Sequence, residues 1–316
     1  MIIKYAIGID LGGTSIKYSL ICHNGEFALT GKLPSCANVS AQAVIGQLIT
    51  AINICKQFAE ENDMAIQGVG IGTPGIVDDS NRIIIGGAEN IVGWENVFLS
   101  DILEKEINLP VTIGNDANLM GLGETYYGAG IGYKNIVFIT VGTGIGGAVV
   151  IDGKLFNGFD NRGTELGHTP LIANGKPCMC GSVGCLEAYA STVALIERYI
   201  ERAKEKNILL DNTPEINGEY IITKFKANDS IAVEVLEEHC RLLGHGIAGF
   251  VNIFSPQRII IGGGLPESGD FYIEKVKKYA SKYWLSACAE NTEIVAAKLG
   301  NKAGTMGAGQ LVLSGI

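Results

Sequence analysis

The segment Ile7–Phe27 reads I-G-I-D-L-G-G-T-S-I-K-Y-S-L-I-C-H-N-G-E-F and contains a complete unit of secondary structure. Its apolar runs predict two strands separated by a Gly/Thr turn, and the pair Asn24-Gly25 is a hairpin signal. The segment Val137–Phe156, V-F-I-T-V-G-T-G-I-G-G-A-V-V-I-D-G-K-L-F, repeats this order with Asp152-Gly153 in its later turn. We interpret the two as duplicated β-hairpin units, although glycine-rich hairpins also resemble one another by chance.

Outward from these hairpins, strand-like apolar runs alternate with longer helical patterns, which predicts an α/β fold. The segment Asn207–Asn228 is polar, and we expect it to be irregular surface. Short strands are expected at Arg258–Ile261 and Glu293–Ala297. The predicted helices are Ala41–Glu61, Ala117–Tyr127, Leu186–Lys206, Ser230–Phe254 and Thr305–Ser314.

Length and composition restrict the class of protein. A chain of 316 residues can form two domains, and its net charge of −9 argues against nucleic acid or an anionic membrane as the main partner. The first expected strand begins so early that no signal peptide is expected. The longest uncharged run, Ile136–Ile151, is shorter than the roughly 18 residues that a membrane span needs. We therefore expect a soluble cytoplasmic protein.

Three cysteines and a histidine have the spacing of a metal site. His168, Cys178, Cys180 and Cys185 would form a closed tetrahedral set, which is typical of structural zinc. A disulfide cluster is the alternative, but Cys178 and Cys180 are too close in sequence for an easy mutual bridge. The remaining cysteines are scattered among apolar neighbours and are expected to be reduced. We expect a zinc-binding loop at residues 165–187.

Glycine-rich turns are the candidate phosphate sites. In D-L-G-G-T-S-I-K (Asp10–Lys17), backbone N–H groups can face phosphate oxygens and Asp10 can hold Mg²⁺. The turn T-V-G-T-G-I-G-G (Thr140–Gly147) offers a second clamp, and no P-loop motif is present. A third run, Gly262–Gly264, could lie against adenine or ribose, although a helix-entry turn is equally consistent. The predicted cofactor-binding residues are Asp10, Gly12, Gly13, Thr14, Lys17, Thr140, Gly142, Thr143, Gly144, Gly262, Gly263 and Gly264.

Carboxylates complete the chemistry. Asp116 follows Asn115 at a strand-to-helix junction, where it is either a helix cap or the group that accepts a hydroxyl proton. Glu165 and Glu187 bracket the metal ligands. They either bind vicinal hydroxyls of a polyol together with His168, or only orient the zinc ligands.

Together these residues resemble the ROK family of repressors and sugar kinases, over nearly the whole chain. The matching motifs are D-x-G-G-T-x-x-K at Asp10–Lys17, G-T-P-G at Gly72–Gly75, G-N-D-A-N at Gly114–Asn118, T-V-G-T-G-I-G-G at Thr140–Gly147, E-L-G-H at Glu165–His168, C-x-C-G-x-x-G-C-x-E at Cys178–Glu187 and G-G-G at Gly262–Gly264.

The resemblance implies a two-lobed, actin-like ATPase (ribonuclease H-like) fold with the site in the cleft. The expected N-terminal lobe is 1–117, with a C-terminal helix at about 303–316 packed back on it. The expected C-terminal lobe is 118–302. Asp116 becomes the catalytic base. The sugar is held by Asn115, Asp116, Glu165, His168 and Glu187, and Gly75 and Asn90 line the same pocket.

The leading hypothesis is a kinase that uses ATP and Mg²⁺ to phosphorylate the 6-hydroxyl of a gluco-type sugar, with structural Zn²⁺. Glucose and a β-glucoside such as cellobiose are both compatible, and N-acetylmannosamine is an alternative. A sugar-sensing regulator of the same family is a second class, which the acidic charge and the early first strand argue against. A zinc hydrolase is disfavoured because its metal needs an open position. A homodimer is expected from the resemblance.

Overall fold

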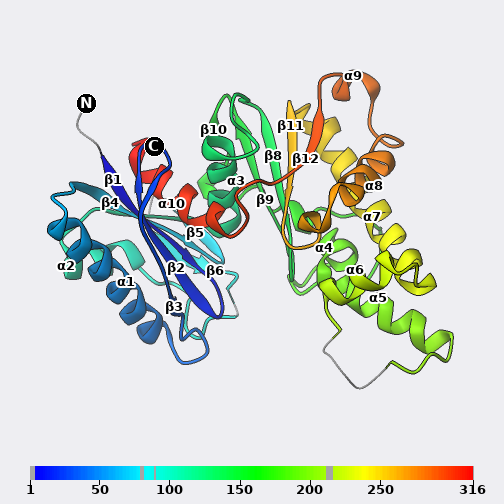
Figure 1. The fold of residues 1–316 in the computed structure, drawn as a ribbon, viewed down its shortest axis with the longest axis horizontal. Helices are drawn as coiled ribbons and strands as arrows, with labels where there is room; N and C mark the ends of the chain where they lie inside the picture. The colour runs from blue at the N-terminus through cyan, green and yellow to red at the C-terminus, as the bar shows by residue number, and fades with distance from the viewer. Residues whose placement is uncertain (1–3, 79–81, 89, 211–215, 316) are drawn as a thin grey trace. The chain divides into compact units, whose positions relative to one another are not determined.

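Two units make up the chain, and each draws on separate stretches of sequence (Figure 1). The structure is a computed structural model, and it describes residues 4–78, 82–88, 90–210 and 216–315. The first unit comprises residues 1–132, 148–164 and 299–316, and the second comprises residues 133–147 and 165–298. This division differs from the expected boundary after residue 117, because that boundary falls inside a continuous helix, α3, that belongs to the first unit.

The first unit contains a five-stranded sheet in the order β3-β2-β1-β4-β7. Its strands are β1 (Tyr5–Leu11), β2 (Ser15–Cys22), β3 (Phe27–Pro34), β4 (Ile66–Thr73) and β7 (Val111–Asn115). The first three are antiparallel neighbours, whereas β1, β4 and β7 run parallel. The register places Asp10 directly opposite Lys17. A separate small hairpin pairs β5 (Ile76–Asp78) with β6 (Ile83–Gly86).

One side of this sheet forms the main apolar core of the first unit, together with α1 (Ala41–Glu61) and α2 (Leu99–Ile107) (Figure 1). Side chains alternate along a strand, so Ile7, Ile9 and Leu11 all point into this core. The Ser40 side chain caps α1 by accepting a hydrogen bond from the Ala43 N–H. The prediction of a helix at Ala41–Glu61 is confirmed.

The other side packs on α10 (Ala303–Leu313), which in turn packs on α3 (Asp116–Tyr127). Glycines make this contact possible. A Cβ on Gly8 would lie 2.0 Å from the Thr305 carbonyl oxygen, and one on Gly70 would lie 1.9 Å from the Ala308 carbonyl oxygen. The helix therefore rests directly on the backbone of β1 and β4, which no larger residue at either position would allow.

A second five-stranded sheet has the order β10-β9-β8-β11-β12. Its strands are β8 (Ile136–Val141), β9 (Ile145–Ile151), β10 (Lys154–Leu155), β11 (Arg258–Gly262) and β12 (Glu293–Ala296). Strand β11 runs parallel to both β8 and β12, and β10 runs antiparallel to β9. The pairing of β8 with β11 sets Gly262 opposite Thr140. The glycine-rich segments that start at these two residues therefore lie at the same edge of the sheet.

The helices of the second unit gather around α7 (Ser230–Phe254) (Figure 1). Asp229 caps α7 by accepting hydrogen bonds from two backbone N–H groups, and the predicted bounds are confirmed. The other helices of this unit are α4 (Glu187–Ala190), α5 (Thr192–Glu205), α6 (Gly218–Lys226), α8 (Asp270–Ala280) and α9 (Ser286–Ala289). The short 3₁₀ turns of the chain are Phe159–Asn161, Leu166–His168, Pro266–Ser268 and Gly300–Lys302.

Two expectations for the second unit need correction. The segment expected to be irregular contains α6, because Asn217 caps it through a hydrogen bond from the Tyr220 N–H. Part of that segment, residues 211–215, lies outside the described residues. The helix expected at Leu186–Lys206 is two helices, since Ser191 has extended backbone and caps α5.

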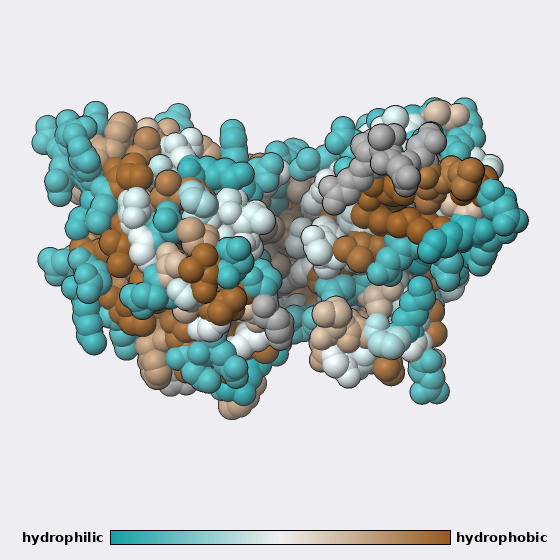
Figure 2. Space-filling model, turned by 90° about the horizontal axis from the view of Figure 1, so that it is seen from below, coloured by the Kyte–Doolittle hydropathy of each residue, from teal (hydrophilic) through white to brown (hydrophobic). Residues whose placement is uncertain are grey.

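Apolar and hydrophilic side chains are mixed over the face of each unit seen in Figure 2. The most exposed large apolar side chains of the described residues are Phe159, Met179, Ile253, Leu209 and Leu285. Among the described residues, no helix combines the length and the apolar character that a membrane span requires.

Candidate functional site

The turn between β1 and β2 presents bare backbone to solvent. The Gly12 N–H donates to the Ser15 carbonyl over 2.9 Å and closes the turn. The turn is supported by the residue that follows β3, since the Ser35 hydroxyl donates to the Gly13 carbonyl and the Ser35 N–H donates to the Thr14 carbonyl. Gly13 and Thr14 are exposed. This arrangement can receive an anion such as a phosphate group.

Behind this turn, Asp10 and Lys17 form an ion pair of 3.5 Å across the β1-β2 ladder. The Lys17 ammonium also donates to the Asn301 side-chain oxygen over 3.0 Å. Asp10 is buried, and desolvation raises the pKa of its carboxyl while Lys17 lowers it. A Cβ on Gly304 would lie 2.7 Å from the Asp10 carboxyl carbon, so the start of α10 packs on Asp10. A buried carboxylate with one cationic neighbour is suited to a metal ion or its waters.

The junction between β7 and α3 shows which residue caps the helix, a role that the sequence left open for Asp116. Asn115 is the N-cap of α3, because its side-chain oxygen accepts a hydrogen bond from the Asn118 N–H over 3.2 Å. Asp116 is the first helical residue, and one of its carboxylate oxygens accepts from the Ala117 N–H. Asn115 also donates to the Gly75 carbonyl over 3.1 Å. The cap is therefore assigned to Asn115, and the half-buried Asp116 remains a candidate for proton transfer.

The segment after β6 links the surroundings of Gly75 to the first turn. A Cβ on Gly75, whose φ is +93°, would lie 2.5 Å from the Gly86 carbonyl and 3.1 Å from the Ala88 Cβ. Two residues farther, the exposed Asn90 places its amide nitrogen against Gly13. The structure thus sets Asn90 beside the first glycine turn, and it sets Gly75 beside Asn115.

The turn between β8 and β9 is joined to the metal loop by a carboxylate. The Ile145 N–H donates to Glu187 Oε2 over 2.8 Å. A Cβ on Gly144 would lie 2.3 Å from the same oxygen, so glycine there lets the carboxylate approach the turn without moving. The Gly142 N–H donates to the Gly144 carbonyl, and the Gly142 carbonyl accepts from the Thr192 N–H at the start of α5. Glu187 is thereby fixed on the second glycine turn.

A cavity of about 790 Å³ opens beside this turn, within the second unit. The third glycine run forms part of it. Gly263 has a φ of +103°, and a Cβ there would lie 2.1 Å from the Val141 carbonyl. The cavity is lined by Val141, Gly142, Thr143, Thr192, Val193, Ile196, Asn217, Gly218, Glu219, Ile222, Thr223, Lys226, Gly264, Leu265, Glu267 and Ser268. Its walls therefore come from two glycine segments and from α5 and α6.

The four predicted metal ligands come together. The ligand atoms of His168, Cys178, Cys180 and Cys185 all lie within 4.8 Å of one another. Cys180 Sγ lies 3.7 Å from Cys185 Sγ, and Cys178 Sγ lies 3.7 Å from His168 Nδ1. A zinc–sulfur bond of about 2.3 Å in a tetrahedron gives sulfur atoms about 3.8 Å apart, whereas a disulfide needs about 2.05 Å. The geometry fits a zinc ion and contradicts a disulfide.

The loop that carries these ligands turns sharply at two glycines. Gly181 and Gly184 have φ values of +84° and +76°, which side chains rarely adopt. The Gly181 N–H donates to the Cys178 carbonyl, and the Cys178 N–H donates to the Ser182 carbonyl. Burial raises the pKa of the Cys178 thiol to about 12, so its thiolate is unfavourable without a cation nearby. The donor set therefore suits a bound divalent metal.

Glu165 lies among the charges around this loop. Its side chain reaches solvent, yet neighbouring atoms desolvate it in part and raise its pKa. The imidazole of His168 lowers that pKa, and the carboxylate of Glu187 raises it further. The structure thus groups Glu165, His168 and Glu187 in the second unit, where the two carboxylates can accept hydrogen bonds from hydroxyl groups and a metal-bound His168 can donate one.

Some residues of the candidate site have no signal in the motifs. The cavity uses α6, although its segment is polar and was expected to be irregular. The only local signal is Asn217, a favourable N-cap residue directly before Gly218. The contact between Ile145 and Glu187 spans 42 residues of sequence, which no local pattern reveals.

Comparison with known proteins identifies the relatives of this arrangement. A sequence model of the ROK family matches residues 6–314. A glucokinase of Halalkalibacterium halodurans is 32% identical over 315 residues, which cover 98% of this chain and 95% of that protein. A xylose repressor of Caldicellulosiruptor bescii is 32% identical over 313 residues, which cover 98% of this chain and 78% of the repressor.

A solved structure extends the likeness to the fold. A ROK family glucokinase from Streptomyces griseus, in complex with glucose and AMPPNP, matches with a TM-score of 0.83 at 30% identity. The match covers 98% of this chain and 99% of that protein.

Proposed function

Because the chain belongs to the ROK family, we propose that it is an ATP-dependent sugar kinase. In this proposal it transfers the γ-phosphoryl group to the 6-hydroxyl of a gluco-type sugar, either glucose or a β-glucoside such as cellobiose. The observation that carries the proposal is the match along 98% of the chain to a glucokinase in complex with glucose and AMPPNP. The glycine turns, the cavity and the carboxylates described above support it independently.

The nucleotide is assigned to two sets of residues. In the second unit, the cavity takes the adenosine against Gly263 and Gly264, and Thr143 with its neighbouring glycines binds phosphate oxygens. In the first unit, the turn Gly12–Thr14 offers backbone N–H groups to phosphate. Asp10 would hold Mg²⁺, and the Lys17 ammonium would attract the negatively charged phosphate groups. When bound, Mg²⁺ supplies charge neutralisation for the phosphate oxygens.

Asp116 is the proposed catalytic base. It accepts the proton of the 6-hydroxyl while the bond from O6 to the γ-phosphorus forms and the bond from that phosphorus to the bridging oxygen of ADP breaks. Its position as the first residue of α3, with the cap supplied by Asn115, supports this role. Asn115 and Gly75 are proposed to bind the sugar from the same unit, and Asn90 is proposed to contribute to that pocket.

In the second unit, the Glu165 and Glu187 carboxylates are proposed to accept hydrogen bonds from sugar hydroxyls, and the ring N–H that zinc leaves on His168 is proposed to donate one. The zinc proposed on His168, Cys178, Cys180 and Cys185 is structural, because four protein ligands leave no open position. Its role is to fix His168 and the loop that leads to Glu187.

A coupled assay of ADP release tests the activity and the substrate. It compares glucose, cellobiose, N-acetylmannosamine, fructose and allose at equal concentrations. The proposal predicts the highest kcat/KM with glucose or cellobiose. Preference for N-acetylmannosamine would assign that kinase activity instead, and no ADP release above background with any sugar would refute the kinase.

The repressor relative favours one second candidate, a sugar-sensing regulator. The net charge of −9 argues against direct DNA binding. A gel-shift assay with genomic fragments at moderate salt distinguishes the two, since a kinase gives no specific retardation. We also propose a homodimer, the commonest symmetric assembly, which sedimentation analysis would test.

A further inference from the structure

The helix that begins with Glu187 is too short to be stable alone. Helix α4 (Glu187–Ala190) is a single turn, and forming one turn costs more conformational entropy than its hydrogen bonds return. No side chain caps its N-terminus. The position of Glu187 on the Ile145 N–H must therefore be set by tertiary contacts.

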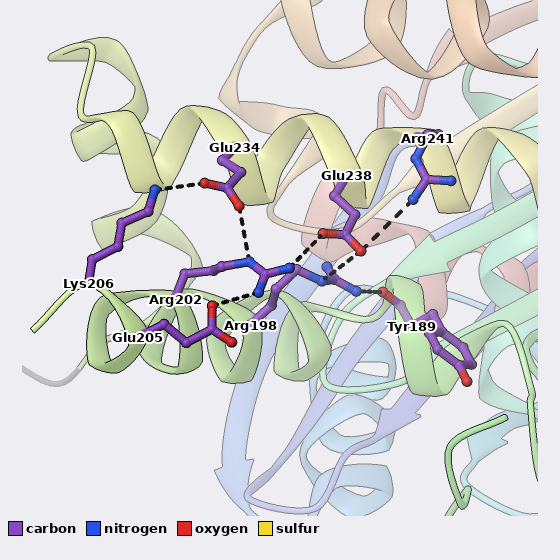
Figure 3. Close-up of polar contacts among 8 residues, drawn as sticks. All are labelled: Tyr189, Arg198, Arg202, Glu205, Lys206, Glu234, Glu238 and Arg241. Atoms are coloured by element: carbon purple, nitrogen blue, oxygen red, sulfur yellow. Dashed lines mark hydrogen bonds and ion pairs between the residues drawn. The ribbon is translucent and has the colours of Figure 1, made fainter.

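Tyr189 supplies contacts on two sides of α4. Its carbonyl oxygen accepts a hydrogen bond of 2.9 Å from Arg198 Nη2 on α5 (Figure 3). Its hydroxyl oxygen accepts one of 2.6 Å from the Lys176 N–H, two residues before the metal ligand Cys178. A Cβ on Gly175 would lie 2.2 Å from this hydroxyl oxygen, so the phenol is packed tightly against the metal loop. Tyr189 thus connects α5, α4 and the metal loop.

Arg198 is an unusual partner for a backbone carbonyl because it is only 6% exposed. Desolvation lowers the pKa of its guanidinium, and Glu238 Oε1 lies 3.6 Å from its Nε. Its Nη1 is buried and has no hydrogen-bond partner among the described residues. Burying a cation in this way is costly, and an apolar side chain of similar size is often at least as stable. Stability alone therefore does not account for an arginine here.

The surrounding ion pairs provide a contrast. Arg202, one turn farther along α5, forms ion pairs with Glu205 and Glu234 (Figure 3). Lys206 also pairs with Glu234, and Arg241 pairs with Glu238. These side chains are partly exposed, so each ion pair contributes little to the stability of the fold. Arg198 alone of the three arginines drawn there donates to α4.

We propose that Arg198 is a positioning residue for phosphoryl transfer, which acts through the Tyr189 carbonyl to hold Glu187 on the second glycine turn. The inference rests on the proposed kinase activity and adds to it. The Glu187 carboxylate then has a double function: Oε2 fixes the Ile145 N–H of the phosphate turn, and Oε1, which lies 3.8 Å from Cys178 Sγ of the metal loop, is the oxygen proposed to receive a sugar hydroxyl. Arg198 keeps α4, and with it that carboxylate, in register with the turn.

The test compares Arg198→Met with Arg202→Met. The first keeps the apolar stem and removes the donor to α4, whereas the second removes only partly exposed ion pairs. We expect Arg198→Met to weaken AMPPNP binding about fivefold to tenfold, to raise the KM for the sugar similarly, and to leave the melting temperature within a few degrees of wild type. Arg202→Met should leave binding and kinetics unchanged. Unchanged binding in Arg198→Met would overturn the proposal.

A double-mutant cycle with Glu187→Gln tests whether Arg198 acts through Glu187. If it does, adding Arg198→Met to Glu187→Gln causes little further loss of AMPPNP affinity. Additive losses would contradict the proposal. Arg198→Lys, which keeps a cation and a donor, should recover part of the affinity, and it replaces Arg198→Met in the cycle if that variant does not fold. Calorimetric AMPPNP binding needs no sugar turnover, so a wild type inactive on every sugar would refute the kinase while these comparisons still decide the role of Arg198.

Discussion

The two glycine turns are similar in sequence and different in the charges around them. Aligned by their hairpins, the Asp10 and Lys17 positions of the first turn correspond to Thr140 and Gly147 of the second. The first turn therefore has its own ion pair, in which Asp10 is buried and Lys17 is partly exposed, whereas the second receives a carboxylate from Glu187, 42 residues beyond Ile145. A Cβ on Gly147 would lie 2.6 Å from Leu166 Cδ1, so no lysine fits there.

We propose that this difference gives the two turns different roles in binding the nucleotide. A buried carboxylate beside an ammonium group favours a metal ion with phosphate, while a turn of N–H groups and threonine hydroxyls favours phosphate or ribose oxygens directly. The two sheets have matching strand orders, β3-β2-β1-β4-β7 and β10-β9-β8-β11-β12. In each sheet, three strands that are consecutive in sequence are followed by two strands that run parallel to the third. Two sheets of similar strand order are thus proposed to carry turns with different electrostatic roles.

The largest expected effect comes from changing the corresponding positions. Asp10→Asn should lower kcat/KM for ATP by about 100-fold or more, because it removes the proposed metal ligand. Thr140→Val is the matched change in the second turn and should lower kcat/KM less than about tenfold, since it removes one hydroxyl. Steady-state kinetics over a range of Mg²⁺ concentrations measures both. Equal losses in the two variants would remove the distinction between the turns.

Metal removal should affect the second turn and spare the first. Stripping the protein with a chelator is expected to lower its melting temperature by several degrees and to weaken sugar binding about tenfold, because the loop that leads to Glu187 loses its cross-link. Metal analysis before treatment should find about one zinc per chain. Re-addition of zinc is the control and should restore both properties. A stripped protein with unchanged melting and unchanged sugar affinity would contradict a structural zinc.

Two glutamates, Glu124 and Glu187, are expected to differ in whether they affect stability or substrate binding. Glu124 is fully buried, and its two oxygens accept hydrogen bonds from the Ala129 and Leu299 N–H groups. Glu124→Gln should cost about 1–3 kcal/mol by leaving a buried N–H unsatisfied, with little change in KM. Glu187→Gln, at a partly exposed site, should instead raise KM with little change in melting. Thermal denaturation and steady-state kinetics of both variants measure these effects. A Glu124→Gln variant with changed KM and unchanged melting, or a Glu187→Gln variant with the opposite result, would contradict the assignment.

The smallest effect concerns the pH dependence of stability. Desolvation raises the pKa of Asp10 in the folded protein more than Lys17 lowers it, so the carboxylate destabilises the fold above that pKa. The destabilisation is present at neutral pH and disappears as the pH falls to about 3.8, where the unfolded group also binds its proton. Asp10→Asn should therefore melt slightly above wild type at pH 7, with a margin that shrinks on acidification. A margin that grows on acidification would show the opposite sign.

The parts of this molecule that local sequence predicts are those with a local cause. The hydrophobic period and the caps Ser40 and Asp229 define α1 and α7, and the spacing of His168 with the cysteines predicts the metal cluster. The metal cluster is local because its ligands lie within 18 residues of sequence. By contrast, the bonds from Ile145 to Glu187 and from Arg198 to Tyr189 depend on how separate elements pack, which no periodicity encodes.

The same distinction explains the elements that differed from expectation. The single residue Ser191 divides the expected long helix, because its side chain caps α5 after an extended backbone step. The polar segment that forms α6 has a helix because Asn217 caps it and Ile221 and Ile222 bury one side, features too short to produce a clear period.

The most direct test of the kinase assignment is the turnover of Asp116→Asn with the preferred sugar, measured together with the affinity for that sugar. We expect kcat to fall about 10²–10⁴-fold, because proton transfer is lost, while the sugar dissociation constant stays within about threefold of wild type. A variant that keeps near-normal kcat would contradict the role of Asp116 as the base.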